Sequence, residues 1–309
     1  MNIFTPHSRM RDLVADNSML LPVLSRFGIA LGFGDNTVEA VCRQSGVDVD
    51  TFLAVANFVV NPPGNRRTEV NLQSLIDYLK SAHHYFLSYV IPNIRRRMIE
   101  AVTSGNLANY LSLHILCFYD EWVEDVRKHL GMEESQVFGY VERLLAGERP
   151  AGYTIADFNA QHHPITHKLK EIKELLICHF TADTARVDLL NSLLFDIITC
   201  EGDLTTHCLV EDDLFVPAVE KLEQQLEAQH SKEVSDYALD EHGDVILTPR
   251  ERDIIAAIAS GKSNKEIADK LCLSVHTVAT HRRNICAKLN LHSASAIAVF
   301  AVIHGITGQ

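Results

Sequence analysis

Apolar residues recur at helical spacing along most of the chain, with polar residues on the opposite face. Four long stretches keep this pattern: residues 72–98, 107–146, 155–180 and 185–229. Pro92 is expected to kink the first stretch, and Gly131 or Gly147 to break the second. The pattern predicts an all-α protein built around a four-helix bundle.

Breaks in the pattern divide the chain into four segments. Residues 1–62 carry short helical patterns and predict a small N-terminal helical domain. The run Asn-Pro-Pro-Gly-Asn at 61–65 cannot continue a helix, and the bundle is expected over 70–228. A polar, acidic stretch at 229–245 predicts a linker, and 246–309 a C-terminal domain.

The C-terminal segment has strong helix-start signals. Thr248 is a cap, Pro249 follows at the first helical position, and Glu251 completes a capping box. Further helices are predicted over 264–271 and 275–289. Short helices joined by tight turns predict a helix-turn-helix, with the second helix entering a DNA groove.

One constellation of metal-binding residue types occurs twice in the predicted bundle. A lone His stands 45 residues before a His-x-x-x-Glu pair, and the whole set recurs 78 residues later. His and Glu four apart lie on one helical face, and imidazole with carboxylate suits iron or a similar metal. The predicted ligands are His84, His129, Glu133, His162, His207 and Glu211.

Two details of this prediction remain open. The doublets at 83–84 and 162–163 allow either His to bind, and the equal spacing of 45 favours the second of each. Asp125 and Asp203 stand one turn before the two pairs, where each could hold an imidazole. By contrast, His167 and Glu171 lack a repeat partner and predict a solvated pair.

Charge is distributed unevenly. The chain carries −12 in total, made of +4 from residue 248 onward and −16 before it. This asymmetry predicts an acidic regulatory body with a basic binding module. Seven Cys without a CxxC motif indicate reduced thiols. No apolar run approaches the roughly 18 residues that are needed to span a bilayer, and the N-terminal residues show no secretory signal pattern. We therefore expect a cytoplasmic protein without membrane contact.

The bundle resembles the hemerythrin-like di-iron proteins, and most closely the branch that repairs iron centres. The resemblance rests on three features: His84 eight residues before Pro92, His129 and Glu133 running to Phe138, and His207 and Glu211 running to Pro217. It implies two iron ions with four terminal His ligands and two bridging Glu ligands. Residues 1–62 look like the small N-terminal domain of this branch, but the turn Ala-Leu-Gly-Phe-Gly at 30–34 stands where that family usually has a Cys pair.

The C-terminal segment resembles the LuxR-type DNA-binding domain over its whole length, from Leu-Thr-Pro-Arg-Glu-Arg onward. The pattern implies phosphate contacts from Lys265, Thr277, His281 and Arg282. It implies base contacts from Ala279, Thr280 and Arg283, with the Arg283 fork matching guanine. Lys288 completes the expected DNA-binding set.

Together these resemblances imply a transcriptional regulator in which a di-iron domain senses oxygen, nitric oxide or redox state. We expect a homodimer that binds a double-stranded DNA operator and is not an enzyme. The alternative is a di-iron repair or nitric-oxide-reducing protein with a DNA-binding tail.

Overall fold

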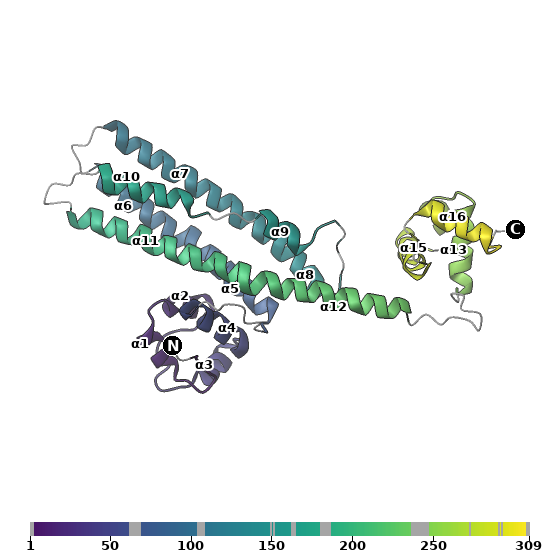
Figure 1. The fold of residues 1–309 in the computed structure, drawn as a ribbon, viewed down its shortest axis with the longest axis horizontal. Coiled ribbons are helices and arrows are strands. Elements are labelled where there is room, and N and C mark those ends of the chain that lie inside the picture. Colours follow the sequence, from purple (N-terminus) through teal and green to yellow (C-terminus); the bar gives the residue numbers. More distant parts are fainter. Residues whose placement is uncertain are drawn as a thin grey trace. The chain divides into compact units, whose positions relative to one another are not determined.

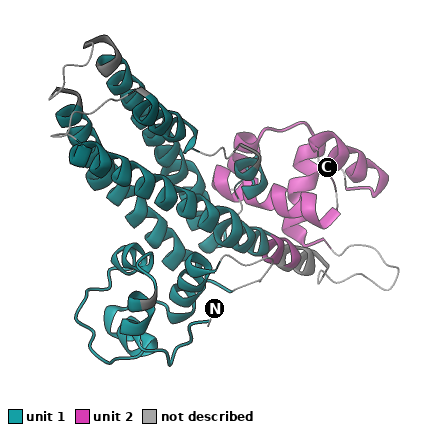
Figure 2. Ribbon diagram, turned by 60° about the vertical axis from the view of Figure 1, so that its left-hand side comes forward, with its two compact units in different colours: residues 1–223 teal, residues 224–309 magenta. Residues whose placement is uncertain are grey.

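The computed structural model describes residues 3–61, 69–103, 109–148, 150, 152–161, 165–179, 187–235, 247–271, 273–289, 291 and 293–306. Two compact units are present, Met1–Glu223 and Gln224–Gln309 (Figure 2). Over the described ranges the structure is helical, with one isolated bridge between Arg9 and Thr37. The all-α prediction is confirmed.

The N-terminal domain consists of four short helices: α1 (Met10–Asp16), α2 (Leu20–Arg26), α3 (Val38–Ser45) and α4 (Val49–Val60). Thr37 and Asp48 cap α3 and α4 by accepting hydrogen bonds from backbone N–H groups in the first turn. Gly28 follows α2 with a φ of 69°, a conformation that favours glycine. Phe27 packs against Phe52 of α4 and against Tyr78 of the first bundle helix, α5. These ring contacts join the N-terminal domain to the bundle.

The bundle is formed by long helices interrupted by three π-helical turns. In chain order the elements are α5 (Leu72–Tyr85), η1 (Phe86–Val90), α6 (Ile91–Thr103), α7 (Asn109–Met132), η2 (Glu133–Phe138), α8 (Gly139–Leu145), α9 (Ile155–Gln161), α10 (His167–His179), α11 (Val187–Val210), η3 (Glu211–Phe215) and α12 (Val216–Ser235). Helices α6, α7, α10 and α11 lie side by side, each contacting two of the others (Figure 1). The four-helix bundle is therefore present as predicted.

The π-helical turns explain how two prolines are accommodated. Pro92 and Pro217 each stand two residues after a π-helical turn, η1 and η3 respectively. Proline lacks the N–H of a regular helix and clashes with the carbonyl four residues earlier, and a local wide turn relieves both problems. Gly131 does not break α7; the helix continues through η2 and α8 to Leu145, and Gly147 follows with a φ of 78°.

The helix ends differ from the prediction at two further points. The third predicted stretch is divided into α9 and α10, and residues 162–164 between them lie outside the described set. Helix α12 continues to Ser235, six residues past the expected end at 229. The boundary between the two compact units falls inside α12.

The bundle core is apolar and fully buried over most of its length. Trp122 and Tyr119 of α7 contribute its largest side chains. The Trp122 indole donates a hydrogen bond to the carbonyl of Ile165, and the Tyr119 hydroxyl to that of Ile91. Both polar ends are thus satisfied inside the core, as buried aromatic residues require.

The C-terminal unit has four further helices: α13 (Pro249–Ala259), α14 (Asn264–Leu271), α15 (Val275–Leu289) and α16 (Ala294–Ile303). The capping box between Thr248 and Glu251 is present as predicted. Ile254, Ile267 and Ile285 are fully buried in the core of this unit. In the described residues, no single helix is long and apolar enough to cross a membrane; α15 and α16 together, bent by 64°, meet the length and composition test.

Candidate metal centre and nucleic-acid interface

Two imidazoles and two carboxylates meet inside the bundle. His83 comes from α5, Glu133 from the start of η2, His207 from α11 and Glu211 from the start of η3. All four are at most 1% exposed, and their donor atoms lie within 4.8 Å of one another. Ligands on opposite sides of one ion stand about 4.2 Å apart at bond lengths of about 2.1 Å, so the cluster could hold a metal.

Among the described residues, each π-helical turn begins at or just after a member of this cluster. Glu133 is the first residue of η2, Glu211 is the first residue of η3, and His83 lies three residues before η1. Such turns widen the helix locally and redirect side chains, and they occur often at functional sites. The backbone irregularities and the candidate ligands therefore coincide.

The two oxygens of Glu133 face different imidazoles. Oε1 lies 2.8 Å from Nε2 of His129, and Oε2 lies 3.4 Å from Nε2 of His83. One carboxylate therefore lies between two imidazoles that come from different helices. His129, a predicted ligand, therefore lies beside the cluster through Glu133, and 14% of its side chain is exposed.

His83 has a fixed orientation. Its Nδ1 lies 3.0 Å from Oε1 of Glu134, and an ionised carboxylate can only accept a hydrogen bond. Nδ1 therefore carries the hydrogen, and Nε2 presents a lone pair to the cluster. That Nε2 lies 3.2 Å from Nε2 of His207, a separation that a shared proton or cation would stabilise.

His207 is neutral at physiological pH. Burial lowers the pKa of His207 to about 4, and the opposing attraction of the Glu133 carboxylate does not offset this effect. The neutral imidazole is the form that binds metal ions. The donor set therefore fits a divalent cation without prior loss of a proton from His207.

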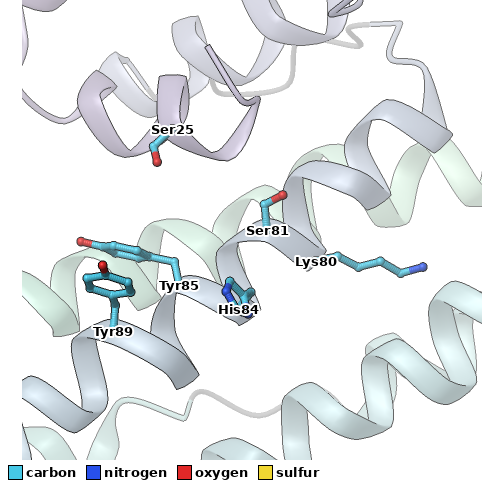
Figure 3. A pocket seen from close by; sticks show the side chains of 6 residues that line it. All are labelled: Ser25, Lys80, Ser81, His84, Tyr85 and Tyr89. Atoms are coloured by element: carbon cyan, nitrogen blue, oxygen red, sulfur yellow. The ribbon is translucent and has the colours of Figure 1, made fainter. Parts of the chain in front are cut away.

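His84, favoured over His83 by the equal spacing, is not in the cluster. His84 is exposed and, together with Ser25 of α2 and Ser81, lines a pocket of about 500 Å³ (Figure 3). Successive residues on a helix point about 100° apart, so only one member of the doublet can face inward. The structure brings His83 to the cluster instead.

His162, with its neighbour His163, lies outside the described residues. His167 and Glu171 form an exposed pair 3.0 Å apart on the bundle surface, as the absence of a repeat partner predicted. That pair is a solvated helix face rather than a metal site.

Neither Asp that precedes a His-x-x-x-Glu pair holds an imidazole. The Asp125 carboxylate accepts a hydrogen bond of 2.7 Å from Lys168 at the surface. Asp203 is buried and accepts a hydrogen bond of 2.6 Å from Arg26 of the N-terminal domain. The expectation for both residues is therefore corrected. Sequence spacing found the His207–Glu211 pair, but no short-range signal indicated Glu134 or Arg26.

The α15 helix carries most of the predicted DNA contacts. Arg283 and Lys265 of α14 are exposed, whereas Thr277, Ala279, Thr280 and His281 are partly buried. Arg282 donates a hydrogen bond of 2.5 Å to Asn264, which ties α15 to α14. The two exposed cations are the candidates with most freedom to meet DNA.

Lys288 was expected to contact DNA, and the structure corrects this. Its ammonium donates hydrogen bonds of 2.8 and 3.1 Å to the Glu251 carboxylate, and only 4% of its side chain is exposed. Burial alone would raise the pKa of Glu251, but hydrogen bonds from Lys288 and Thr248 lower it overall. Lys288 is therefore held inside the C-terminal domain by Glu251.

Comparison with known families agrees with this geometry. Residues 74–243, more than half of the chain, match the hemerythrin HHE cation binding domain. The chain belongs to this family. Residues 245–301 match the luxR family of bacterial regulatory proteins. The hemerythrin-like bundle thus precedes a LuxR-type domain in one chain, as both resemblances implied.

Similar curated proteins are regulatory proteins by name. The transcriptional regulatory protein MctR of Rhizobium johnstonii is 44% identical over 69 residues, 22% of this chain and 32% of that protein. The uncharacterized transcriptional regulatory protein YhcZ of Bacillus subtilis is 48% identical over 63 residues, 20% and 29%. The oxygen regulatory protein NreC of Staphylococcus carnosus is 47% identical over 57 residues, 18% and 26%. The chain spans about a third or less of these relatives' length. No solved structure matches it significantly.

Proposed function

We propose that this chain is a cytoplasmic transcriptional regulator in which a di-iron centre in the hemerythrin-like bundle controls DNA binding by the LuxR-type domain. The observation that carries this proposal is the buried cluster of His83, Glu133, His207 and Glu211 in a chain that also has a LuxR-type domain. Two carboxylates buried beside two imidazoles are costly unless a cation compensates their charge.

Iron is the metal we propose. Mixed imidazole and carboxylate ligands suit iron, and four-helix bundles with inward-facing His and Glu hold di-iron sites. His129, His83 and the two oxygens of Glu133 support a bridged pair of ions. When bound, such a centre supplies reversible redox chemistry and coordination of small diatomic ligands. Oxygen and nitric oxide are the candidate signals, and the name of the relative NreC is a reason to test oxygen first.

Helix α12 is the proposed connection between sensor and DNA-binding domain. It begins five residues after Glu211 and runs without a break from Val216 to Ser235. Twenty helical residues span about 30 Å, so a change at Glu211 has a continuous helix along which to act. We infer that metal-dependent movement of η3 alters the spacing of two LuxR-type domains in a homodimer on its operator.

Metal analysis of purified full-length variants tests the site. Glu133→Ala and Glu211→Ala should each lower iron content sharply, because each removes a buried ligand. Glu171→Ala is the matched control, since Glu171 stands in the exposed His-x-x-x-Glu pair. Full iron occupancy in both Glu133→Ala and Glu211→Ala would exclude this site.

Two further measurements distinguish the sensor from the alternative enzyme. Optical spectra of the iron-loaded protein, with and without oxygen and nitric oxide, should show whether either ligand reaches the centre. Catalytic turnover of nitric oxide by the purified protein would favour the nitric-oxide-reducing alternative. The turn Ala-Leu-Gly-Phe-Gly at 30–34 has no Cys pair, so the thiol chemistry that a repair role would draw on is absent from it.

A further inference from the structure

A buried ion pair joins the N-terminal domain to the bundle beside the candidate metal centre. Nη2 of Arg26, the last residue of α2, donates a hydrogen bond of 2.6 Å to Oδ2 of Asp203 in α11. The two side chains are only 3% and 11% exposed. A pair so deeply buried is strongly coupled to its surroundings, because little water screens it.

Aromatic rings surround the Arg26 guanidinium. Its carbon lies 5.1 Å from the ring centre of Phe86 and 5.9 Å from those of Tyr78 and Tyr85. Burial alone would lower the pKa of Arg26, but Tyr78 and Asp203 raise it overall, so the cation persists. The Phe86 ring in turn packs edge-on against His207, with ring centres 5.7 Å apart. Arg26 is thus one aromatic layer away from a candidate metal ligand.

Asp203 lies at a position from which a carboxylate usually accepts a hydrogen bond from a metal-binding imidazole, here that of His207. The two residues are four apart on α11, and helical side chains lean toward the N-terminus, so the His207 ring lies over the turn of Asp203. Among the described residues, Nδ1 of His207 is buried without a hydrogen-bond partner. Metal-binding imidazoles usually donate their other N–H to a carboxylate, but here Arg26 occupies this carboxylate.

We propose that Arg26 is a positioning residue through which the N-terminal domain adjusts the metal centre, by neutralising Asp203 and holding it away from His207. This inference rests on the proposed metal binding. The N-terminal domain, which lacks the Cys pair, then acts on the metal through charge. Any displacement of α2 that withdraws Arg26 places an uncompensated carboxylate behind His207.

Substitution of Arg26 and substitution of Asp203 should change the metal affinity in opposite directions, because the two side chains carry opposite charges. Arg26→Met leaves the Asp203 carboxylate near the bound cation, so the metal should bind more tightly. Asp203→Asn leaves the guanidinium near the cation, so the metal should bind more weakly. A purely structural role predicts instead that both substitutions damage the bundle and weaken binding alike.

Co²⁺ binding to the full-length protein tests this proposal, with the visible spectrum of the ion and a competing chelator as readouts. Relative to the unaltered protein, Arg26→Met should bind Co²⁺ about 10-fold more tightly and Asp203→Asn about 10-fold more weakly, within the range of second-layer effects on metal sites. The double variant should return to within about threefold of the unaltered protein, because its buried charges are removed together. Arg26→Lys retains the charge and should resemble the unaltered protein.

Unchanged affinity and spectrum in Arg26→Met would overturn the proposal, and so would equal weakening by both single substitutions. If Arg26→Met does not fold, recovery of affinity from Asp203→Asn to the double variant supports the pairing, and absence of recovery overturns it. If the unaltered protein binds neither Co²⁺ nor iron, the proposed metal function itself fails. That result is distinguishable from normal Co²⁺ binding that substitution of Arg26 leaves unchanged.

Discussion

Nδ1 of His83 lies 3.0 Å from Oε1 of Glu134, and this contact orients the buried imidazole toward His207 and Glu133. Glu134 belongs to η2 and is 46% exposed, so the contact links the metal cluster to the surface of the bundle. Glu134 is therefore expected to support the metal centre without binding the metal.

Substitution of Glu134 should weaken metal binding. Glu134→Gln retains the size of the side chain but loses the carboxylate that accepts from His83, and we expect about 10- to 100-fold lower iron affinity. Asp213→Asn, an exposed carboxylate of η3, is the control and should have no effect. Chelator competition measures the iron affinity of both variants. Equal affinities would show that Glu134 does not support the metal centre.

The first His doublet makes a sharp test of the site. His83→Gln should lose most of the bound iron because its imidazole is fully buried in the cluster, while His84→Gln should retain it. Iron per protein, measured after gel filtration, distinguishes them. The opposite ranking would restore the spacing argument that favours His84 and would contradict the side-chain arrangement described above.

The helix-turn-helix formed by α14 and α15 should contribute both sequence specificity and positive charge to DNA binding. Arg283→Ala should weaken operator binding by about 1–3 kcal/mol and relax selection at one base position. Lys265→Ala should weaken binding to all sequences alike and reduce the salt dependence by about one unit, because it removes a phosphate contact. Titrations with cognate and random DNA at several salt concentrations measure both effects. Equal losses of Arg283→Ala on both DNAs would rule out a base contact.

Lys288 should matter for folding of the C-terminal domain and not for DNA contact. Lys288→Met leaves the Glu251 carboxylate buried without its cation, which costs about 3–5 kcal/mol of stability. Combining it with Glu251→Gln should recover part of that loss. Denaturant unfolding measures these changes, and a fully stable Lys288→Met with a lower salt dependence of DNA binding would restore the DNA-contact role.

The lowered pKa of Glu251 adds a pH dependence to the same domain. Its folded pKa lies below the unfolded value of about 4.3. The stabilising contribution is therefore complete above that value and is lost as the pH falls through the folded pKa. Glu251→Gln should flatten this part of the stability profile.

Local patterns predicted what depends on neighbours in sequence. The His129–Glu133 and His207–Glu211 pairs were found because a helix places residues four apart on one face. The capping box at Thr248 was found for the same reason. The choice between His83 and His84 was not, because both positions have apolar neighbours at helical spacing and the equal spacing of 45 carries no information on which side faces inward.

Contacts between distant residues could not be predicted. Arg26 and Asp203 are 177 residues apart, and Glu251 and Lys288 are 37 apart. A Lys on a DNA-binding helix is normally exposed, and nothing local to Lys288 indicates the buried carboxylate that α13 supplies. The π-helical turns had a partial signal in Pro92 and Pro217, but η2 has no proline, and only the structure shows it.

Control of DNA affinity by the metal centre is the central claim, and operator binding in defined metal states tests it most directly. The operator would be a fragment selected from random DNA by the iron-loaded and metal-free proteins. Affinity is then measured at one fixed salt concentration for reduced, oxidised, nitric-oxide-treated and metal-free protein. We predict that at least one state differs from the others by about 1–3 kcal/mol, the usual size of coupling between two sites. Affinities within about twofold in all four states, roughly 0.4 kcal/mol, would contradict the account.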